Sequence, residues 1–484
     1  MPQAALREEV AAIMRVFLTP PCKEKGMNAL LWFVVLYWVI SVGIGLYATR
    51  YVKSSKDYAV AGRSLPMSVV TATVFATWFG SEAVLGVSST FLKDGLGGIV
   101  ADPFGSSLCL ILVGVFFAKK LYRMNLLTIG DYYKKRFGRA AEMLVTICIV
   151  ISYLGWVAAQ IKALGLVFNV VSGGYIPMHW GMIIGAGSVL IYTLMGGMWA
   201  VAITDFLQMI IVVVGMLYIG YEVSGMVGGP GVVIAHAAEA GKFNFWPAAE
   251  LKDVLWFFAA WITMMLGSIP QQDVFQRVMS SKNENVARNA SVLGGVIYFF
   301  FVFIPIFLAY SATLIDPAMV SRLLETDSQL VLPTLIMEKM PVFAQVMFFG
   351  ALLSAIKSCA SATLLAPSVT FTENVLREIR PWKSDREFLF SMRAVVLVFT
   401  VGVTTLAFGV YWQRATRQGA LMAMVLGLVS WITLEYAAPD GLWPPQLAGL
   451  LFSIGGMVVG SLMPQVLAPV PPMVAVPAEG SAQT

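Results

Sequence analysis

Residues 67–92 read MSVVTATVFATWFGSEAVLGVSSTFL, an apolar run that is interrupted at its centre by small and polar residues. A helix needs about 20 apolar residues to cross the ~30 Å hydrocarbon core of a bilayer. Within this run, Gly80, Ser81 and Glu82 stand where a plain spanning helix would be apolar. Gly80 weakens a helix, and helices that break near the bilayer centre line ion and solute sites in transporters. A packing face of small residues between two helices explains the pattern equally well.

The composition extends this interpretation to the whole chain. Of its 484 residues, 58% are hydrophobic and 12% are charged, about half the charged fraction of an ordinary soluble protein. Continuous apolar runs of roughly 18–28 residues favour membrane-spanning helices over the alternating pattern of barrel strands. About twelve such runs predict an all-α integral membrane protein. They are 28–48, 67–92, 97–118, 141–170, 179–196, 200–224, 254–270, 289–312, 343–368, 388–411, 419–437 and 443–464.

The same composition argues against several classes of function. The four cysteines lie far apart and form no CxxC pair, so neither a disulfide framework nor a metal–thiolate site is indicated. The two histidines are scattered, which leaves a membrane-embedded enzyme without a catalytic cluster. No GxxxxGK[ST] stretch is present, so ATP-driven transport is not expected. The net charge of +5 requires no nucleic-acid partner, because the basic residues gather in loops.

The distribution of Lys and Arg predicts the orientation of the chain. Cytoplasmic loops carry an excess of these residues. We therefore expect an N-terminus on the outside of a cytoplasmic membrane, with the lipid bilayer as a partner. One loop breaks the alternation, since Arg414 and Arg417 stand where an external loop is expected. The four basic loops lie at about 50–63, 119–139, 277–288 and 377–386.

Three charged residues, Glu82, Lys162 and Lys357, lie deep within apolar runs. A charge at the bilayer centre costs about 2.5–3.5 kcal/mol on insertion scales, so such residues are candidates for function. Lys357 belongs to SAIKSCASAT at 354–363, whose hydroxyl groups suit a hard cation such as Na⁺. Hydrogen bonding between helices is the alternative explanation of those hydroxyls.

Further polar and aromatic residues are candidates for solute binding. In GSIPQQDVFQR at 267–277, two glutamine amides follow a helix-breaking proline. They form either a solute-binding edge or a plain turn at the membrane exit. Aromatic side chains suit an amino acid or a quaternary ammonium group, although aromatics that face lipid are commoner. The predicted solute-binding residues are Trp78, Ser81, Glu82, Tyr153, Gln160, Gln271 and Gln272.

In this order, these stretches make the chain resemble the sodium:solute symporter family, which includes sodium-coupled proline, sugar and pantothenate carriers. The resemblance covers about residues 27–464 and implies a LeuT-like fold of two inverted five-helix repeats after one extra N-terminal helix. The repeats would run over about 67–224 and 254–411. It also implies alternating access driven by a sodium gradient. The matching stretches are AGRSLP at 61–66, FATWFGSE at 75–82, GGMWAVAITDFLQ at 196–208, PQQDVFQRV at 270–278, ALLSAIKSCASATLLAPS at 351–368 and YWQRATRQGA at 411–420.

The resemblance also implies a sodium site between the first broken helix and the run 343–368. Asp205 would help sodium to pass to the cytoplasm, and the alternative is an acid at the start of an interfacial helix. The implied Na⁺ ligands are the carbonyls of Ala76, Phe79 and Ala355, the hydroxyl of Ser358, and Cys359 at the last position.

Two departures from the family pattern weaken the expectation of sodium coupling. The last ligand position usually holds Ser or Thr, whereas the Cys359 thiol is a soft ligand for a hard ion. Lys357 places an ammonium group one residue from Ser358. That group either replaces Na⁺, which makes transport proton-coupled or uncoupled, or pairs with Glu82 and leaves the ion site intact.

A third departure concerns the number of spans. The family has two helices where this chain offers the single run 388–411, one fewer than the family pattern, so a non-transporting relative is an open alternative. A membrane sensor of the same fold is disfavoured, because only a short tail, 465–484, follows the last run. We expect that tail to be disordered, and residues 1–26 to be either an extension that is not native or an amphipathic helix at the membrane interface. The solute is an amino acid, an organic acid or a quaternary amine, and the oligomeric state stays open.

Overall fold

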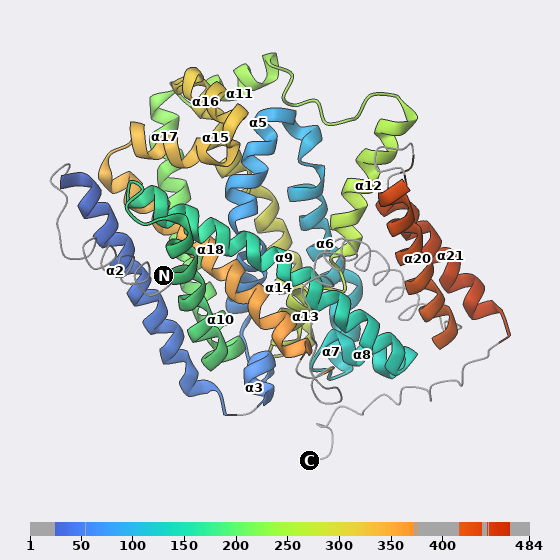
Figure 1. Ribbon diagram of the computed structural model, residues 1–484. Helices are drawn as coiled ribbons and strands as arrows, with labels where there is room; N and C mark the ends of the chain where they lie inside the picture. Colours follow the sequence, from blue (N-terminus) through green and yellow to red (C-terminus); the bar gives the residue numbers. More distant parts are fainter. Residues whose placement is uncertain are drawn as a thin grey trace, which may run out of the picture.

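The computed structural model describes residues 25–53, 55–371, 374, 416–437, 443 and 445–464. In this part the chain is almost entirely helical (Figure 1), which confirms the predicted all-α membrane class. Eight helices are long and apolar enough to span a membrane, or up to nine with one bent pair, among the described residues. The predicted count of about twelve is not confirmed. Residues 1–24, the run 388–411 and the tail 465–484 lie outside the described residues.

The first half of the chain supplies one outer helix and five further spans or part-spans. The expected span 179–196 contains only a shorter apolar helix, Trp180–Val189. The elements are α2 (Lys25–Tyr47), η1 (Ala48–Tyr51), α3 (Ser55–Val60), η2 (Ala61–Arg63), α4 (Met67–Trp78), η3 (Glu82–Gly86), α5 (Val87–Gly98), η4 (Val100–Gly105), α6 (Ser106–Leu112), η5 (Val113–Phe117), α7 (Ala118–Arg123), α8 (Ile129–Phe137), α9 (Arg139–Val171), α10 (Met178–Met226) and α11 (Pro230–Glu239).

The second half of the chain also contains a broken helix that is followed by long membrane-spanning helices. The expected span 443–464 contains a shorter apolar helix, Leu451–Leu462. The elements are α12 (Leu251–Gly267), α13 (Gln272–Met279), α14 (Glu284–Phe301), α15 (Phe303–Ile315), α16 (Pro317–Thr326), η6 (Ser328–Leu330), α17 (Val331–Lys339), α18 (Val342–Phe371), α20 (Arg417–Ala437) and α21 (Pro445–Leu462).

The first predicted helix break is present. Helix α4 ends at Trp78, and the chain resumes at Glu82 after a bend of 56°. Phe79 has left the helical region with a ψ of 74°. A side chain at Gly80 would place its Cβ 2.8 Å from the Cβ of Cys359, so only glycine lets α18 approach the break this closely.

The second break separates α12 from α13, at Pro270. Proline lacks the amide that would continue the helix. The predicted end of this span at residue 270 is wrong, because a single apolar span runs over Leu251–Met279. Gln272 and Asp273 are fully buried and belong to α13, so a buried helix rather than an exposed loop follows the break.

The two broken helices cross the molecule in opposite directions. The residue before α4, Leu65, forms a parallel β-bridge with Ser281, just after α13. The Leu65 amide donates to the Ser280 carbonyl at 3.0 Å, and the Lys282 amide donates to the Leu65 carbonyl at 3.0 Å. The start of the first broken helix therefore lies beside the end of the second, as inverted repeats require.

Helix α10 consists of two helical parts joined at a kink. Gly197 has a φ of +49°, and an added Cβ would lie 2.4 Å from the Tyr58 carbonyl. Both observations require glycine here. The kink brings the part of α10 that carries Asp205 against α18 and α4, which pack along α10.

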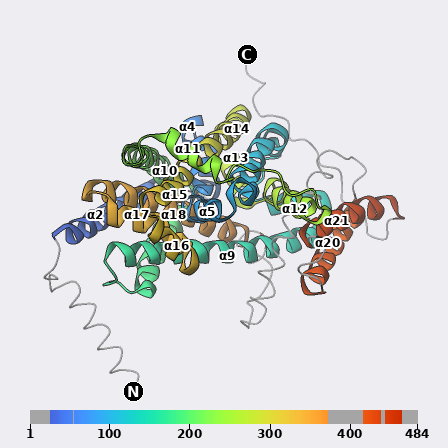
Figure 2. The ribbon, with the colours of Figure 1, turned by 90° about the horizontal axis from the view of Figure 1, so that it is seen from above.

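The basic connections gather at one end of the molecule. Helices α3, α7 and α8 lie together at the lower end in Figure 1, whereas α11 and α16 lie at the upper end. The lower end is held by Tyr122, which donates to the Ser281 carbonyl at 2.9 Å, and by an ion pair of Arg123 with Glu284 at 2.6 Å. Helices α2 and the pair α20–α21 lie at opposite edges of the bundle in both views (Figure 2).

Candidate functional site

The first helix break meets α10 and α18 in a cluster of buried oxygen atoms. The Ser358 hydroxyl lies 3.1 Å from the Ala76 carbonyl oxygen and 2.6 Å from Oδ1 of Asp205. Ser358 is 1% exposed and Asp205 is fully buried. The other carboxylate oxygen of Asp205, Oδ2, is buried without a hydrogen-bond partner among the described residues. One carbonyl, one hydroxyl and one carboxylate, from three helices, thus converge at the break.

These groups fit a hard monovalent cation. Such ions prefer oxygen ligands, and the cluster offers a neutral carbonyl, a hydroxyl and an anionic oxygen. The unpartnered Oδ2 of Asp205 matters most, because a buried carboxylate oxygen without a donor is unfavourable unless something positive satisfies it. Among the described residues, no group of three His, Cys, Asp or Glu side chains suggests a transition-metal site instead.

The other predicted sodium ligands lie around this cluster. A Cβ atom added at Gly80 would lie 2.9 Å from the Cys359 sulfur, so the thiol faces the break. Ala355 is buried one helical turn before Ser358 on α18, and Phe79 is the first residue after α4. Their roles as ligands remain predictions.

The Lys357 ammonium lies neither at the ion site nor beside Glu82, the two places expected from the sequence. It donates to the Ser41 hydroxyl of α2 at 2.9 Å and lies 5.7 Å from the centre of the Tyr192 ring. Consecutive residues of an α-helix point about 100° apart, so Ser358 faces the break while Lys357 faces α2. No ion pair with Glu82 forms within the described part of the chain.

A second buried cluster is centred on Asp273 of α13. Its Oδ2 accepts from the Trp78 indole at 3.0 Å, its Oδ1 accepts from the Tyr153 hydroxyl, and its amide donates to that hydroxyl at 3.0 Å. Arg277 donates to the Asp273 carbonyl at 3.3 Å and is fully buried. The expectation that Arg277 belongs to a cytoplasmic loop is therefore wrong. Sequence reasoning missed both residues, because hydropathy treats a charged run as a loop.

The predicted glutamines are buried and take part in contacts between helices. Gln160 of α9 accepts from the Ser81 amide at 3.2 Å and from its hydroxyl at 3.0 Å, which fixes α9 against the first break. Gln272 accepts from the Ile129 amide at 2.8 Å, which joins the second break to α8. Gln271 is 8% exposed and has a buried, unpartnered Oε1 in the described structure.

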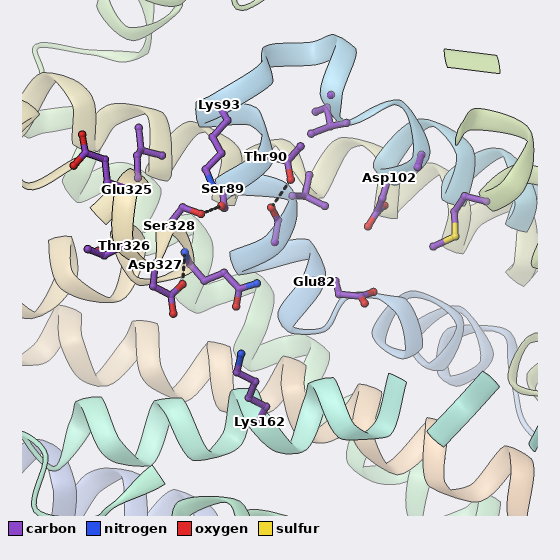
Figure 3. Close-up of a pocket in the computed structure, with 18 residues that line it drawn as sticks. Glu82, Ser89, Thr90, Lys93, Asp102, Lys162, Glu325, Thr326, Asp327 and Ser328 are labelled. Atoms are coloured by element: carbon purple, nitrogen blue, oxygen red, sulfur yellow. Dashed lines mark hydrogen bonds between the residues drawn. The ribbon is translucent and has the colours of Figure 1, made fainter. Parts of the chain in front are cut away.

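A polar cavity of about 640 Å³ lies on the α5 side of the first break (Figure 3). It is open on one side and is lined by η3, α5 and η4, by α9 and α12, and by the segment from α16 to η6. Of the predicted solute-binding residues, Glu82 alone is among those that line it, together with Lys162 of α9. The six others are buried, and their assignment to solute binding remains a prediction.

Asp102 also lines this cavity and was missed by the sequence reasoning. The Tyr298 hydroxyl lies 2.9 Å from both of its carboxylate oxygens, and the Ser106 hydroxyl donates to Oδ1. An acid within the apolar run 97–118 was the available signal. The cavity lies towards α5 and α16, at the end of the molecule opposite the basic helices α7 and α8 (Figure 1).

Two broken helices of opposite direction, with a buried oxygen cluster at the first break, define a secondary transporter of the inverted-repeat class. The chain belongs to the sodium:solute symporter family, whose profile matches residues 58–409. The resemblance inferred from the sequence motifs is thereby confirmed.

Two relatives and one solved structure illustrate the similarity. The human high affinity choline transporter 1 is 28% identical over 398 residues, which cover 77% of this chain and 67% of the relative. The sodium/pantothenate symporter of Escherichia coli K12 is 24% identical over 475 residues, covering 89% and 97%. A substrate-bound, outward-open Na⁺-coupled sialic acid symporter superimposes with a TM-score of 0.79 at 16% identity, over 93% of this chain and 99% of that one. The last likeness concerns the fold alone.

Proposed function

We propose that this protein carries a small polar solute together with Na⁺ across the cytoplasmic membrane by alternating access, with its N-terminus outside. The observation that carries the proposal is the Ser358 hydroxyl, held between the Ala76 carbonyl and the Asp205 carboxylate at the first helix break. The repeats run over about 67–224 and from about 254, as the inverted broken helices support.

The relatives support both the cation and the kind of solute. One is named for pantothenate and sodium, and another for choline. These solutes are small and polar, and they differ in charge. These relatives support an organic acid or a quaternary amine, and the proposed class also includes amino acids.

The geometry gives Na⁺ a structural role in the cycle. An ion on the Ala76 carbonyl, the Ser358 hydroxyl and Oδ2 of Asp205 would join α4, α18 and α10. When the ion leaves, the buried carboxylate loses its compensating charge, and the three helices lose a common ligand. Asp205 lies two helical turns after Gly197, which packs on Tyr58 of α3 at the basic end, so Asp205 stands on the side from which Na⁺ would reach the cytoplasm.

Sodium-dependent thermal stabilisation of the purified protein is the first test. We expect NaCl to raise the melting temperature relative to equal N-methyl-D-glucamine chloride, and Asp205→Asn to abolish the rise. Solute uptake into proteoliposomes with an imposed Na⁺ gradient follows. Undiminished uptake without Na⁺, driven by a pH gradient, would replace sodium by protons. A folded protein that responds to Na⁺ but transports nothing from a broad solute panel would indicate a non-transporting relative.

A further inference from the structure

Charged side chains of both signs line the polar cavity: Glu82, Lys93, Asp102, Lys162, Glu325 and Asp327. Glu82 and Lys162 are the pair beside the first break, since Gln160 of α9 bonds Ser81 there. Glu82 follows the first break in η3, and Lys162 lies in the outer half of α9. Both belong to membrane-spanning segments, where charged side chains are costly and normally pair with each other. No ion pair joins them in the described structure, although both reach the same space (Figure 3).

On the acidic side of the cavity, hydrogen bonds hold the carboxylate of Asp102 in place. The donors are the Tyr298 and Ser106 hydroxyls. Asp102 lines the cavity together with Glu82. The Glu82 side chain reaches the cavity without an ion-pair partner among the described residues, so its carboxylate is the group available to a ligand. Lys162 approaches from the opposite wall, on α9 (Figure 3).

We propose that the transported solute is a zwitterion: a small molecule with a carboxylate at one end and an ammonium or quaternary ammonium group at the other. Glu82, backed by Asp102, binds the cationic end, and Lys162 binds the carboxylate. A solute with only one charge makes one of these two charged contacts and lacks the other, so it binds more weakly than a zwitterion. The inference rests on the proposed transport function and names its substrate class.

Three matched probes test the charge requirement on the wild-type protein. Glycine betaine carries both charges, choline lacks the carboxylate, and 3,3-dimethylbutanoate has a tert-butyl group in place of the quaternary ammonium. Each is titrated against the full-length purified protein in saturating Na⁺, with thermal stabilisation as the measure of binding; L-proline and L-carnitine are further zwitterions. We expect a zwitterion to bind at least about tenfold more tightly than choline, which loses the charge-assisted hydrogen bond from Lys162, or than 3,3-dimethylbutanoate, which loses the charge–charge attraction to Glu82.

Two substitutions test which side chain binds each end of the solute. Lys162→Gln is expected to weaken betaine by about tenfold or more while leaving choline unchanged or tighter. Glu82→Gln is expected to weaken betaine similarly while favouring 3,3-dimethylbutanoate. The control variants Lys252→Gln and Glu250→Gln remove the same charges at exposed positions at the start of α12 and leave all three affinities unchanged.

The outcomes separate this inference from sodium symport. Equal or tighter binding of choline, equal effects of both substitutions on all probes, or no binding by any of the three zwitterions overturns the inference. A zwitterion preference that does not depend on Na⁺ supports the inference and removes sodium coupling. Na⁺-dependent stabilisation by choline alone supports symport and refutes the zwitterion.

Discussion

Removing the hydroxyl of Ser358 tests the oxygen cluster most directly. Ser358→Ala deletes the group that lies 2.6 Å from Asp205 and 3.1 Å from the Ala76 carbonyl, and it creates no new contact. A hydrogen bond to a charged group contributes about 1.5–3 kcal/mol. If the hydroxyl also binds Na⁺, its loss raises the half-saturating Na⁺ concentration by roughly tenfold to a hundredfold, since about 1.4 kcal/mol corresponds to tenfold.

The assay is a titration of ²²Na⁺ binding to purified protein that elutes as a single species on size exclusion. Thr363→Ala is the matched control, because its hydroxyl is equally buried on α18 but bonds the Cys359 carbonyl of its own helix at 2.9 Å. The control lowers stability without changing Na⁺ affinity. A folded Ser358→Ala protein with wild-type Na⁺ affinity would refute the site.

Three further predictions concern the framework. Gly197→Ala places a side chain at a φ of +49° and 2.4 Å from a backbone carbonyl, so we expect a large loss of folded protein in a detergent thermal-stability assay, and wild-type stability would contradict the kink. Gln272→Ala removes the acceptor of the first amide of α8 and is expected to speed hydrogen exchange at the start of α8 by roughly fivefold, the equivalent of about 1 kcal/mol, with the rest of the chain unchanged. The hydrogen bond from Lys339 lowers the pKa of Asp316 below 3.8, so its stabilisation is present at neutral pH and lost as the pH falls through that lowered value. Asp316→Asn should melt slightly earlier than wild type at pH 7, and the difference should shrink as the pH is lowered through that value.

The sequence predicts the helix breaks because their causes are local. Gly80 interrupts α4, and Pro270 cannot continue α12, so both breaks follow from the residues themselves. The extent of the second span could not be predicted this way. Hydropathy ends it at 270, since Asp273 and Arg277 look like a loop, yet both residues are fully buried. Asp273 accepts a hydrogen bond from Trp78 of α4, and Arg277 donates to the Asp273 carbonyl of its own helix.

The sequence predicted which residues form the candidate site better than it predicted where their side chains point. Lys357 and Ser358 are neighbours in the sequence, which does not show that their side chains point in different directions. The structure shows that Lys357 bonds Ser41 of α2, whereas Ser358 bonds Asp205 of α10. Asp102 was overlooked although an acid within an apolar run was the available signal. Its contact with Tyr298 could not be predicted, because Tyr298 lies on a helix far away in the sequence.

The β-bridge between Leu65 and Ser281 has a mechanical consequence. It joins α4 to α13, the inner halves of two helices that belong to different repeats. A rotation that opened one inner half would carry the other with it unless both backbone hydrogen bonds broke. The boundary between moving and stationary parts therefore need not follow the boundary between repeats. It can pass through the two helix breaks, so that α4 and α13 rotate together as one rigid unit against the rest of the bundle.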